Sequence, residues 1–224
     1  MIQGYGGSKV IDANYTGLDN QNAFNGLEFK IASVFSFDWY YQVTLKNLEI
    51  TGGKGDTNGS SSAIHAASRD TCNYNFLTLE NVKIYGNTGN RTAYINPANF
   101  TATNVEIYNN DDAGLAASCS GVQILNKNVS LNNVYIHDNS ISDENDEDET
   151  TLKGAGLYIQ SSHADIENLT VKNNKIILKE GSSVVANGAG VYLVCTPTIK
   201  GNCQISGNEI ENADGSKTQS NVYL

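Results

Sequence analysis

The sequence predicts an all-β fold, a single-stranded right-handed parallel β-helix (a solenoid) of about six to seven rungs. Three observations predict it. Six short segments share one pattern, an asparagine followed by an apolar residue, any residue and another apolar residue. Within them the apolar residues alternate with a period of two, as in a strand that buries one face. Asparagine and glycine, which favour turns, supply 30 and 21 of the 224 residues, so a helix bundle is disfavoured.

The six segments superpose without gaps on one asparagine column, at successive spacings of 34, 23, 29, 35 and 34 residues. A unit of this size cannot bury its apolar face alone, so the units must stack. Stacked asparagines then lie about 4.8 Å apart, and their amides can bond in a ladder. Asparagine also tolerates a left-handed backbone at a strand corner. The predicted structural ladder consists of Asn47, Asn81, Asn104, Asn133, Asn168 and Asn202.

A second column lies three residues beyond each segment and reads Gly53, Asn87, Asn110, Asn139, Asn174 and Asn208. Each unit then continues with small residues and a second alternating strand, most clearly at 154–159 and 188–193. The period of two predicts which residues face inward. They include Leu48, Ile50, Val82, Ile84, Val105, Ile107, Val134, Ile136, Leu157, Ile159, Leu169, Val171, Val191, Leu193, Cys203 and Ile205.

Other folds with parallel or antiparallel strands fit less well. A βαβ fold needs amphipathic helices between its strands. The connections at 86–92 and 109–113 are too short and too rich in asparagine and glycine for helices. An antiparallel sandwich would not produce gapless asparagine columns at unequal spacings.

The chain divides into a short N-terminal part and the repeats. Residues 1–42 are predicted to be a cap or a degenerate first rung, and residues 43–224 the β-helix repeats, truncated within the last copy. The stretch 34–41 is aromatic. Two interpretations stay open for it: a plug at the end of the core, or a platform on which sugar rings stack.

Charge and hydropathy exclude some partners. The net charge is −10, and nucleic-acid binding needs clustered lysine and arginine, so no nucleic-acid partner is expected. No apolar run approaches the roughly 18 residues of a membrane span, so this segment is not expected to insert into a membrane. The N-terminus has no basic region before an apolar stretch. Either the protein is cytosolic or this chain is a segment of a longer protein, and the end within a repeat favours the segment.

Acidic residues offer the main metal and catalytic candidates. Six acids occupy residues 143–149, and oxygen ligands at alternate positions suit calcium, with Asp143, Asp146 and Asp148 as the candidates. The alternative, which the sequence favours, is an extruded loop kept disordered by self-repulsion. The pair Asp111 and Asp112 is predicted to lie in a solvated turn. No catalytic residue and no other cofactor is predicted.

Histidines and cysteines complete the candidates. His65 and His137 are expected to face outward, and no zinc-type ligand spacing occurs. Two disulfide pairings remain conceivable, Cys72 with Cys119 and Cys195 with Cys203.

The repeats resemble the polymorphic outer-membrane proteins, bacterial autotransporter passengers with a pectate-lyase-like β-helix. The matching residues, over about 43–224, are Gly-Ala-Gly-Leu at 154–157, Gly-Ala-Gly-Val at 188–191, and apolar-x-x-Asn elements ending at Asn87, Asn110, Asn139, Asn174 and Asn208. The family favours Gly-Gly-Ala and Phe-x-x-Asn, whereas isoleucine or valine replaces the phenylalanine here. The resemblance implies a secreted or cell-surface protein, often an adhesin, and transfers no catalytic residue.

Three functions follow as expectations. The first is a segment of a bacterial cell-surface or secreted protein that acts as an adhesin or a glycan-contacting scaffold, with host surfaces or glycans and adjoining rungs of a longer chain as partners. The second is a polysaccharide-active lyase or hydrolase of the same fold, although the sequence leans against an enzyme. The third is a purely structural spacer.

Overall fold

The computed structural model describes residues 2–3, 9–12, 34–37, 41–55, 61–67, 75–113, 121–143 and 151–224. Within them the chain forms 22 strands and no helix. The first eleven are β1 (Ile2–Gln3), β2 (Lys9–Asp12), β3 (Phe35–Phe37), β4 (Gln42–Thr51), β5 (Ser61–Ala66), β6 (Phe76–Tyr85), β7 (Thr88–Gly89), β8 (Arg91–Ile95), β9 (Asn99–Tyr108), β10 (Asp111–Asp112) and β11 (Val122–His137). The others are β12 (Ser140–Ser142), β13 (Thr151–Lys153), β14 (Leu157–Lys172), β15 (Lys175–Ile177), β16 (Val185–Asn187), β17 (Val191–Val194), β18 (Thr198–Lys200), β19 (Gln204–Ser206), β20 (Glu209–Glu211), β21 (Lys217–Gln219) and β22 (Val222–Tyr223).

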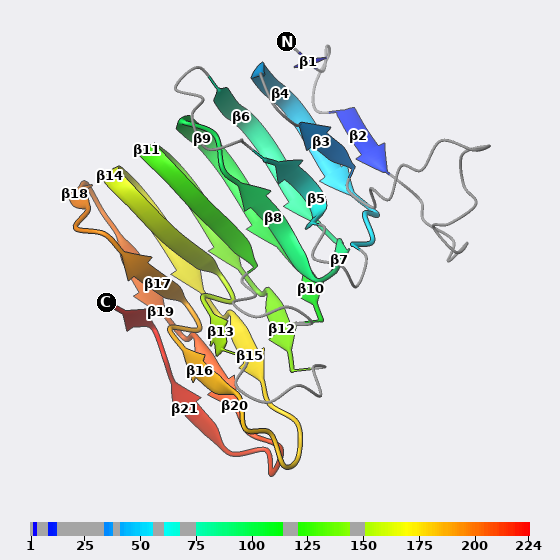
Figure 1. The fold of residues 1–224 in the computed structure, drawn as a ribbon, viewed down its shortest axis with the longest axis vertical. Helices are drawn as coiled ribbons and strands as arrows, with labels where there is room; N and C mark the ends of the chain where they lie inside the picture. The colour runs from blue at the N-terminus through cyan, green and yellow to red at the C-terminus, as the bar shows by residue number, and fades with distance from the viewer. Residues whose placement is uncertain are drawn as a thin grey trace.

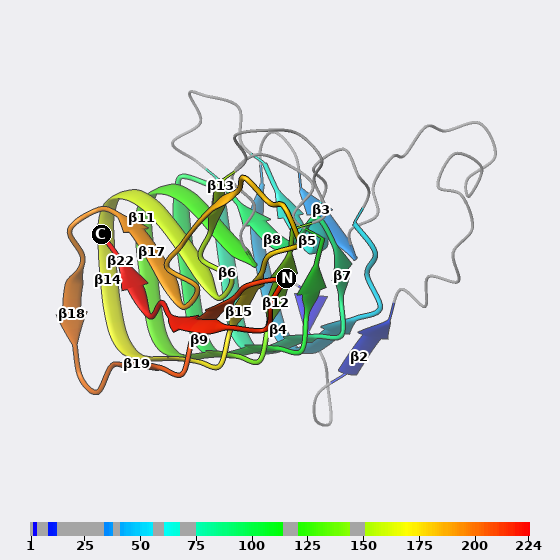
Figure 2. The same cartoon turned by 90° about the horizontal axis from the view of Figure 1, so that it is seen from below.

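The described strands form three sheets, and the largest holds 14 strands around the path β1-β4-β6-β9-β11-β14-β17-β22. A six-stranded sheet runs β21-β20-β15-β12-β10-β7, and β13 pairs with β16. Among these strands every pair is parallel except β20 with β21. The strands lie side by side from β4 to β18 (Figure 1), and the long strands bend round like ribs (Figure 2). The predicted all-β, parallel architecture is confirmed, and the strongly curled sheet is consistent with a β-helix or solenoid.

Three apolar columns run through the paired strands of the large sheet. The first is Ile2, Leu45, Leu79, Ala102, Leu131, Ile166 and Ile199. The second is Ile11, Ile50, Ile84, Ile107, Ile136, Val171 and Ile205. The third is Phe35, Ile64, Ala93, Val122, Leu157, Val191 and Val222. From β3 and β4 onward, successive strands thus place like side chains over one another.

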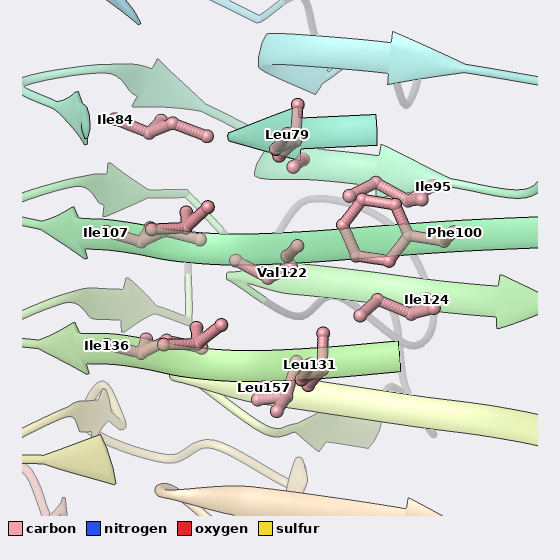
Figure 3. Close-up of a pocket in the computed structure, with 14 residues that line it drawn as sticks. Leu79, Ile84, Ile95, Phe100, Ile107, Val122, Ile124, Leu131, Ile136 and Leu157 are labelled. Carbon is pink, nitrogen blue, oxygen red and sulfur yellow. The ribbon is translucent and has the colours of Figure 1, made fainter. Parts of the chain in front are cut away.

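The predicted inward residues are buried, except Cys203 and Ile205, which are partly buried and pack against the core. Figure 3 shows aliphatic side chains and Phe100 gathered in the interior between the strands. The free space among them is about 10 Å³ and is lined by apolar side chains. A space of this size has no room for a ligand, and its lining offers a water no hydrogen-bonding partner, so this part of the interior is dry, packed core.

The corners between strands depend on residues in the left-handed region. Asn47, Asn81, Asn104, Asn133 and Asn168 have φ between 53° and 55°. A sixth corner differs, because Gly201 (φ 65°) takes the left-handed conformation and Asn202 follows it. The cause is one additional residue. Lys200 and Gln204 pair with Glu167 and Thr170 of β14. Three residues separate Lys200 from Gln204, whereas only two separate Glu167 from Thr170.

Two asparagine ladders result, and they differ in burial. In the first, on the outer surface, the Nδ2 of Asn81 donates to Asn47 Oδ1 at 2.9 Å, that of Asn104 to Asn81 at 3.0 Å, and that of Asn133 to Asn104 at 2.7 Å. In the sixth unit the backbone N–H of Asn202 instead donates to Asn168 Oδ1 at 2.9 Å. The predicted ladder column therefore lies outside the core.

The buried ladder is the second column. Each Nδ2 donates to the next Oδ1 at 2.8–3.1 Å, through Asn87, Asn110, Asn139, Asn174, Asn208 and finally Asn221. Gly53 precedes this series and donates its N–H to Asn87 Oδ1. A Cβ at position 53 would lie 1.9 Å from the Ser62 carbonyl oxygen, so asparagine cannot occupy the position.

The described strands of residues 1–42 continue the parallel pairing, since β1 and β2 pair with β4 and β3 pairs with β5. In the aromatic stretch, the rings of Phe35 and Phe37 stack at 6.0 Å, and Phe37 lies 5.8 Å from the ring of buried Tyr41. Both phenylalanines pack against the main core, as a plug would. Trp39 and Tyr40 lie outside the described residues.

Candidate ligand-binding face

One outer face, just beyond the surface asparagine corners, gathers polar and aromatic side chains. It lies on β4, β6, β9 and β11, and we call it the tyrosine face. The strand register places seven outward residues in two adjacent columns. The first column is Glu49, Lys83, Glu106 and Tyr135, and the second is Tyr85, Tyr108 and His137.

The aromatic rings of this face stack from strand to strand. Tyr85 and Tyr108 have ring centroids 5.1 Å apart, and Tyr108 and His137 have centroids 5.2 Å apart with planes 3° from parallel. Tyr135, two residues before His137 on β11, stacks on the same imidazole at 3.9 Å. Parallel strands about 4.8 Å apart impose this spacing on any aromatic column. The ring edges and hydroxyls, rather than most ring faces, therefore point outward.

Charged groups tie the two columns together. The Tyr85 hydroxyl donates to Glu49 Oε2 at 3.1 Å. Lys83 Nζ lies 3.3 Å from Glu106 Oε2, and the other Glu106 oxygen lies 3.3 Å from His137 Nε2. The bond with Glu106 raises the pKa of Lys83, which keeps its charge. Burial raises the pKa of the Tyr108 hydroxyl, which remains a donor at neutral pH.

An open hollow of about 300 Å³ adjoins this network. Its lining residues come from three neighbouring strands and are Asn81, Val82, Lys83, Asn104, Val105, Glu106, Asn133 and Tyr135. Each asparagine amide has two N–H groups and an oxygen with two lone pairs. The ladder uses one N–H and one lone pair of Asn104, so further hydrogen-bonding capacity faces the hollow. Tyr135, 37% exposed, supplies an accessible apolar surface beside these groups.

The face combines amide donors and acceptors, one ammonium, one carboxylate and an aromatic ring around a surface hollow. Sites that bind small polar ligands have this composition, with a few directed polar groups beside an apolar wall. Four of the seven residues of the tyrosine face lie at the variable position between the two apolar residues of the repeat. Sequence comparison of the units missed them because that position changes from Glu49 to Lys83, Glu106 and Tyr135.

The acidic pair on β10 differs from its prediction. Asp111 is exposed, but Asp112 is buried, and the expectation of a solvated turn is wrong for it. Asp112 Oδ2 accepts hydrogen bonds from the N–H and the hydroxyl of Thr92, both at 2.9 Å, whereas Oδ1 is buried without a partner. Burial raises the pKa of the Asp112 carboxyl well above its usual value, against the effect of the Thr92 bonds.

The calcium candidates are only partly placed. Asp143 is buried and its Oδ2 accepts a hydrogen bond from Ser182, while Asp146 and Asp148 lie outside the described residues. In the described part of the chain, no group of three or more histidine, cysteine, aspartate or glutamate side chains is placed to hold a metal ion. Calcium binding at 143–149 remains a prediction, and calorimetry without heat at millimolar calcium would remove it.

The remaining candidate residues are His65 and the cysteines. His65 is half-buried and stacks on Tyr94 at 5.3 Å. Cys195 and Cys203 are free thiols, so the disulfide considered between them does not form. Cys72 and Cys119 lie outside the described residues.

A second aromatic column runs along β8, β11, β14, β17 and β22. Tyr158 and Tyr192 stack at 5.4 Å, and Tyr192 and Tyr223 at 4.7 Å. The Arg91 guanidinium lies over the Tyr94 ring and donates to Gln123. Tyr94 and Gln123 are register partners and belong to this column. Tyr158 and Gln123 are buried, so the middle of this column offers little accessible surface.

Within the described residues, no helix has the length and apolar character to span a membrane. Neither a family model, nor a curated protein, nor a solved structure matches the chain.

Proposed function

We propose that the chain is a β-solenoid scaffold that contacts glycans through the tyrosine face without cleaving them. The observation that carries the proposal is the hollow beside Tyr135, where the surface asparagine amides meet Lys83 and Glu106. A sugar presents hydroxyl groups around a ring with apolar C–H faces. Amide and charged groups match the hydroxyls, and an accessible aromatic ring matches the apolar face.

The repeating geometry favours a polymer over a single sugar. Equivalent side chains on β6, β9 and β11 recur at the strand spacing, about 4.8 Å. A chain of sugars laid along the stacking direction meets Asn81, Asn104 and Asn133 in turn. Several weak contacts then add along one ligand, which is how a shallow surface reaches useful affinity.

The finer architecture and the location belong to the same proposal. We propose a right-handed β-helix of about six to seven rungs, because parallel crossovers are right-handed in nearly all proteins. The resemblance of the Gly-Ala-Gly and apolar-x-x-Asn elements to autotransporter passengers supports an adhesin-like role, as part of an exported bacterial protein at the cell surface.

Cleavage of a polysaccharide is the second candidate. Glu49 and Glu106 occupy the same column with Lys83 between them, so their backbones lie about 9.6 Å apart at two strand spacings. Inverting glycosidases hold their two carboxyl groups about 6.5–9.5 Å apart. Each carboxylate here, however, already has a partner, Tyr85 for Glu49 and Lys83 with His137 for Glu106. These contacts favour a binding surface.

A glycan array combined with a reducing-sugar assay separates the functions. Binding without release of reducing ends is the expected result. Release of reducing ends that stops in the Glu106→Gln variant would replace the proposal by the hydrolase. Neither binding nor cleavage would leave the structural spacer.

A single variant locates the contact. Tyr135→Ala removes the exposed ring beside the hollow, and we expect about tenfold weaker binding to the best glycan, equivalent to about 1.4 kcal/mol. Tyr223→Ala is the matched control, because this tyrosine is 43% exposed but lies on β22. Equal losses in both variants, or none in Tyr135→Ala, would contradict binding at the tyrosine face.

A further inference from the structure

The surface asparagine ladder stops at Asn133, although the asparagine corner continues in the next level. Its bonds all run in one direction, since each Nδ2 donates to the Oδ1 one level closer to β4, and the last of these donors is Asn133. Asn168 follows on β14 with the same left-handed backbone (φ 53°), but its oxygen accepts from the next level, at Asn202. Among the described residues, Asn133 Oδ1 accepts no hydrogen bond.

This oxygen is the accepting end of a chain of amides. Successive amide bonds polarise one another, so an amide that donates its N–H becomes a better acceptor at its oxygen. Asn133 is exposed and lines the hollow, so a ligand can reach its amide. A ligand group that donates to this oxygen lengthens the ladder in the direction of Asn168.

A secondary amide is the ligand group that best continues the ladder. Its N–H donates to Asn133 Oδ1, and its own oxygen then needs a donor. The hollow offers two donors, the Lys83 ammonium and the second N–H of the Asn104 amide, which the ladder does not use. An N-acetyl group carries such an amide together with a methyl group, and the exposed Tyr135 ring gives this methyl an apolar surface to pack against.

Charge disfavours the two ionic alternatives. An acidic sugar would bring its carboxylate beside Glu106, and the net charge of −10 repels an acidic polymer at longer range. A sugar with a free ammonium group would need a carboxylate partner, but one Glu106 oxygen already lies 3.3 Å from Lys83 Nζ and the other 3.3 Å from His137 Nε2. A neutral amide needs no counterion.

We propose that the glycan bound at the tyrosine face carries N-acetylated amino sugars, with one acetamido group in the hollow as the next member of the amide ladder. This inference rests on the proposed glycan contact and names its class of sugar. A polymer laid along the stacking direction places one acetamido group at Asn133, and its neighbouring sugars pass over Asn104 and Asn81.

Three oligosaccharides of equal length and linkage test the class of sugar by titration calorimetry. They are chito-oligosaccharides, the same chains without their acetyl groups, and cello-oligosaccharides, which carry hydroxyls in place of the acetamido groups. Physiological salt screens the long-range attraction of the cationic deacetylated chain. We expect the acetylated chain to bind about tenfold tighter than either of the others, because it alone makes the amide hydrogen bond.

The outcomes separate this inference from the proposed function. Equal affinities for the acetylated and the cello chains, both lost in Tyr135→Ala, would overturn the acetamido class and keep the glycan contact at the tyrosine face. Binding of none of the three chains, or binding that Tyr135→Ala leaves intact, would overturn the inference together with the site.

The variant Asn133→Gly locates the acetamido group. It removes the amide but keeps the left-handed corner accessible, so the affinity for the acetylated chain should fall about tenfold, to that for the cello chain. Asn47→Gly is the matched control, since Asn47 has the same backbone conformation (φ 55°) and begins the same ladder but does not line the hollow. Circular dichroism first establishes that both variants are folded. A preference for the acetylated chain that survives in Asn133→Gly, or that is lost equally in Asn47→Gly, would overturn the assignment.

Discussion

The two asparagine ladders should differ sharply in their contribution to stability. Asn139 in the buried ladder makes four side-chain hydrogen bonds. Its Oδ1 accepts from the backbone N–H and the Nδ2 of Asn110, and its Nδ2 donates to the Ile107 carbonyl and to Asn174 Oδ1. The variant Asn139→Ala removes all four without backbone strain, because Asn139 is absent from the left-handed residues.

The magnitude follows from these contacts. Four hydrogen bonds at about 1 kcal/mol each give about 4 kcal/mol, and the orphaned Asn110 N–H in the interior adds about 1–3 kcal/mol. The free energy of unfolding should therefore fall by about 5–7 kcal/mol. This is comparable to the whole stability of many domains, about 5–15 kcal/mol, so partial unfolding of the central strands is expected.

Asn133 supplies the matched controls. Its one ladder bond to Asn104 is exposed, so water replaces it, and Asn133→Gly keeps the left-handed corner accessible. We expect a loss below about 1 kcal/mol for Asn133→Gly. Asn133→Ala adds the left-handed penalty of about 1–2 kcal/mol.

Urea unfolding followed by circular dichroism ranks the three variants. Hydrogen exchange of the 105–113 peptide resolves local opening, which matters because stacked repeats need not unfold in one step. A loss in Asn139→Ala no larger than that in Asn133→Ala would refute the assignment of the second column as the stabilising ladder.

Three further predictions concern single side chains. Ile136→Asp places an unpaired charge at a buried position and should unfold the central strands by circular dichroism; a soluble variant with an unchanged melting temperature would show that the inward register is wrong. The raised pKa of Asp112 means that the folded state holds its proton more tightly, so wild-type stability should fall as pH rises from about 4 through the folded-state pKa. Asp112→Asn should lack this slope in melting curves recorded across pH, and equal slopes would refute it. Gly53→Ala should lower the melting temperature, because the Cβ meets the Ser62 carbonyl oxygen; an unchanged value would contradict that close approach.

The core columns could be predicted from the sequence because stacking applies the same demand at every level. Each unit must place an apolar residue over the one below, so Ile50, Ile84, Ile107 and Ile136 recur at one alignment position. The corner asparagines recur for a related reason, since each level needs a residue that accepts the left-handed backbone.

The relative burial of the two asparagine columns could not be predicted. Both columns read as asparagine at the same period, and both form amide ladders. The distinction comes from the cross-section, because Asn104 turns outward at its corner whereas Asn110 points into the interior and bonds the Ile84 carbonyl. Likewise, burial of Asp112 depends on the direction of a two-residue strand, which no local pattern encodes.

The tyrosine face escaped sequence reasoning because a binding surface on stacked strands need not repeat. The same period of two that aligns Val82 and Val105 inside also aligns Lys83 and Glu106 outside. Inside, every level meets a similar neighbour, which selects similar side chains. Outside, each level meets solvent or ligand, so one column changes charge from Glu49 to Lys83 to Glu106 at no cost to packing. The outward positions that vary between units are therefore free to specify a ligand, whereas the inward positions that repeat are committed to holding the strands together.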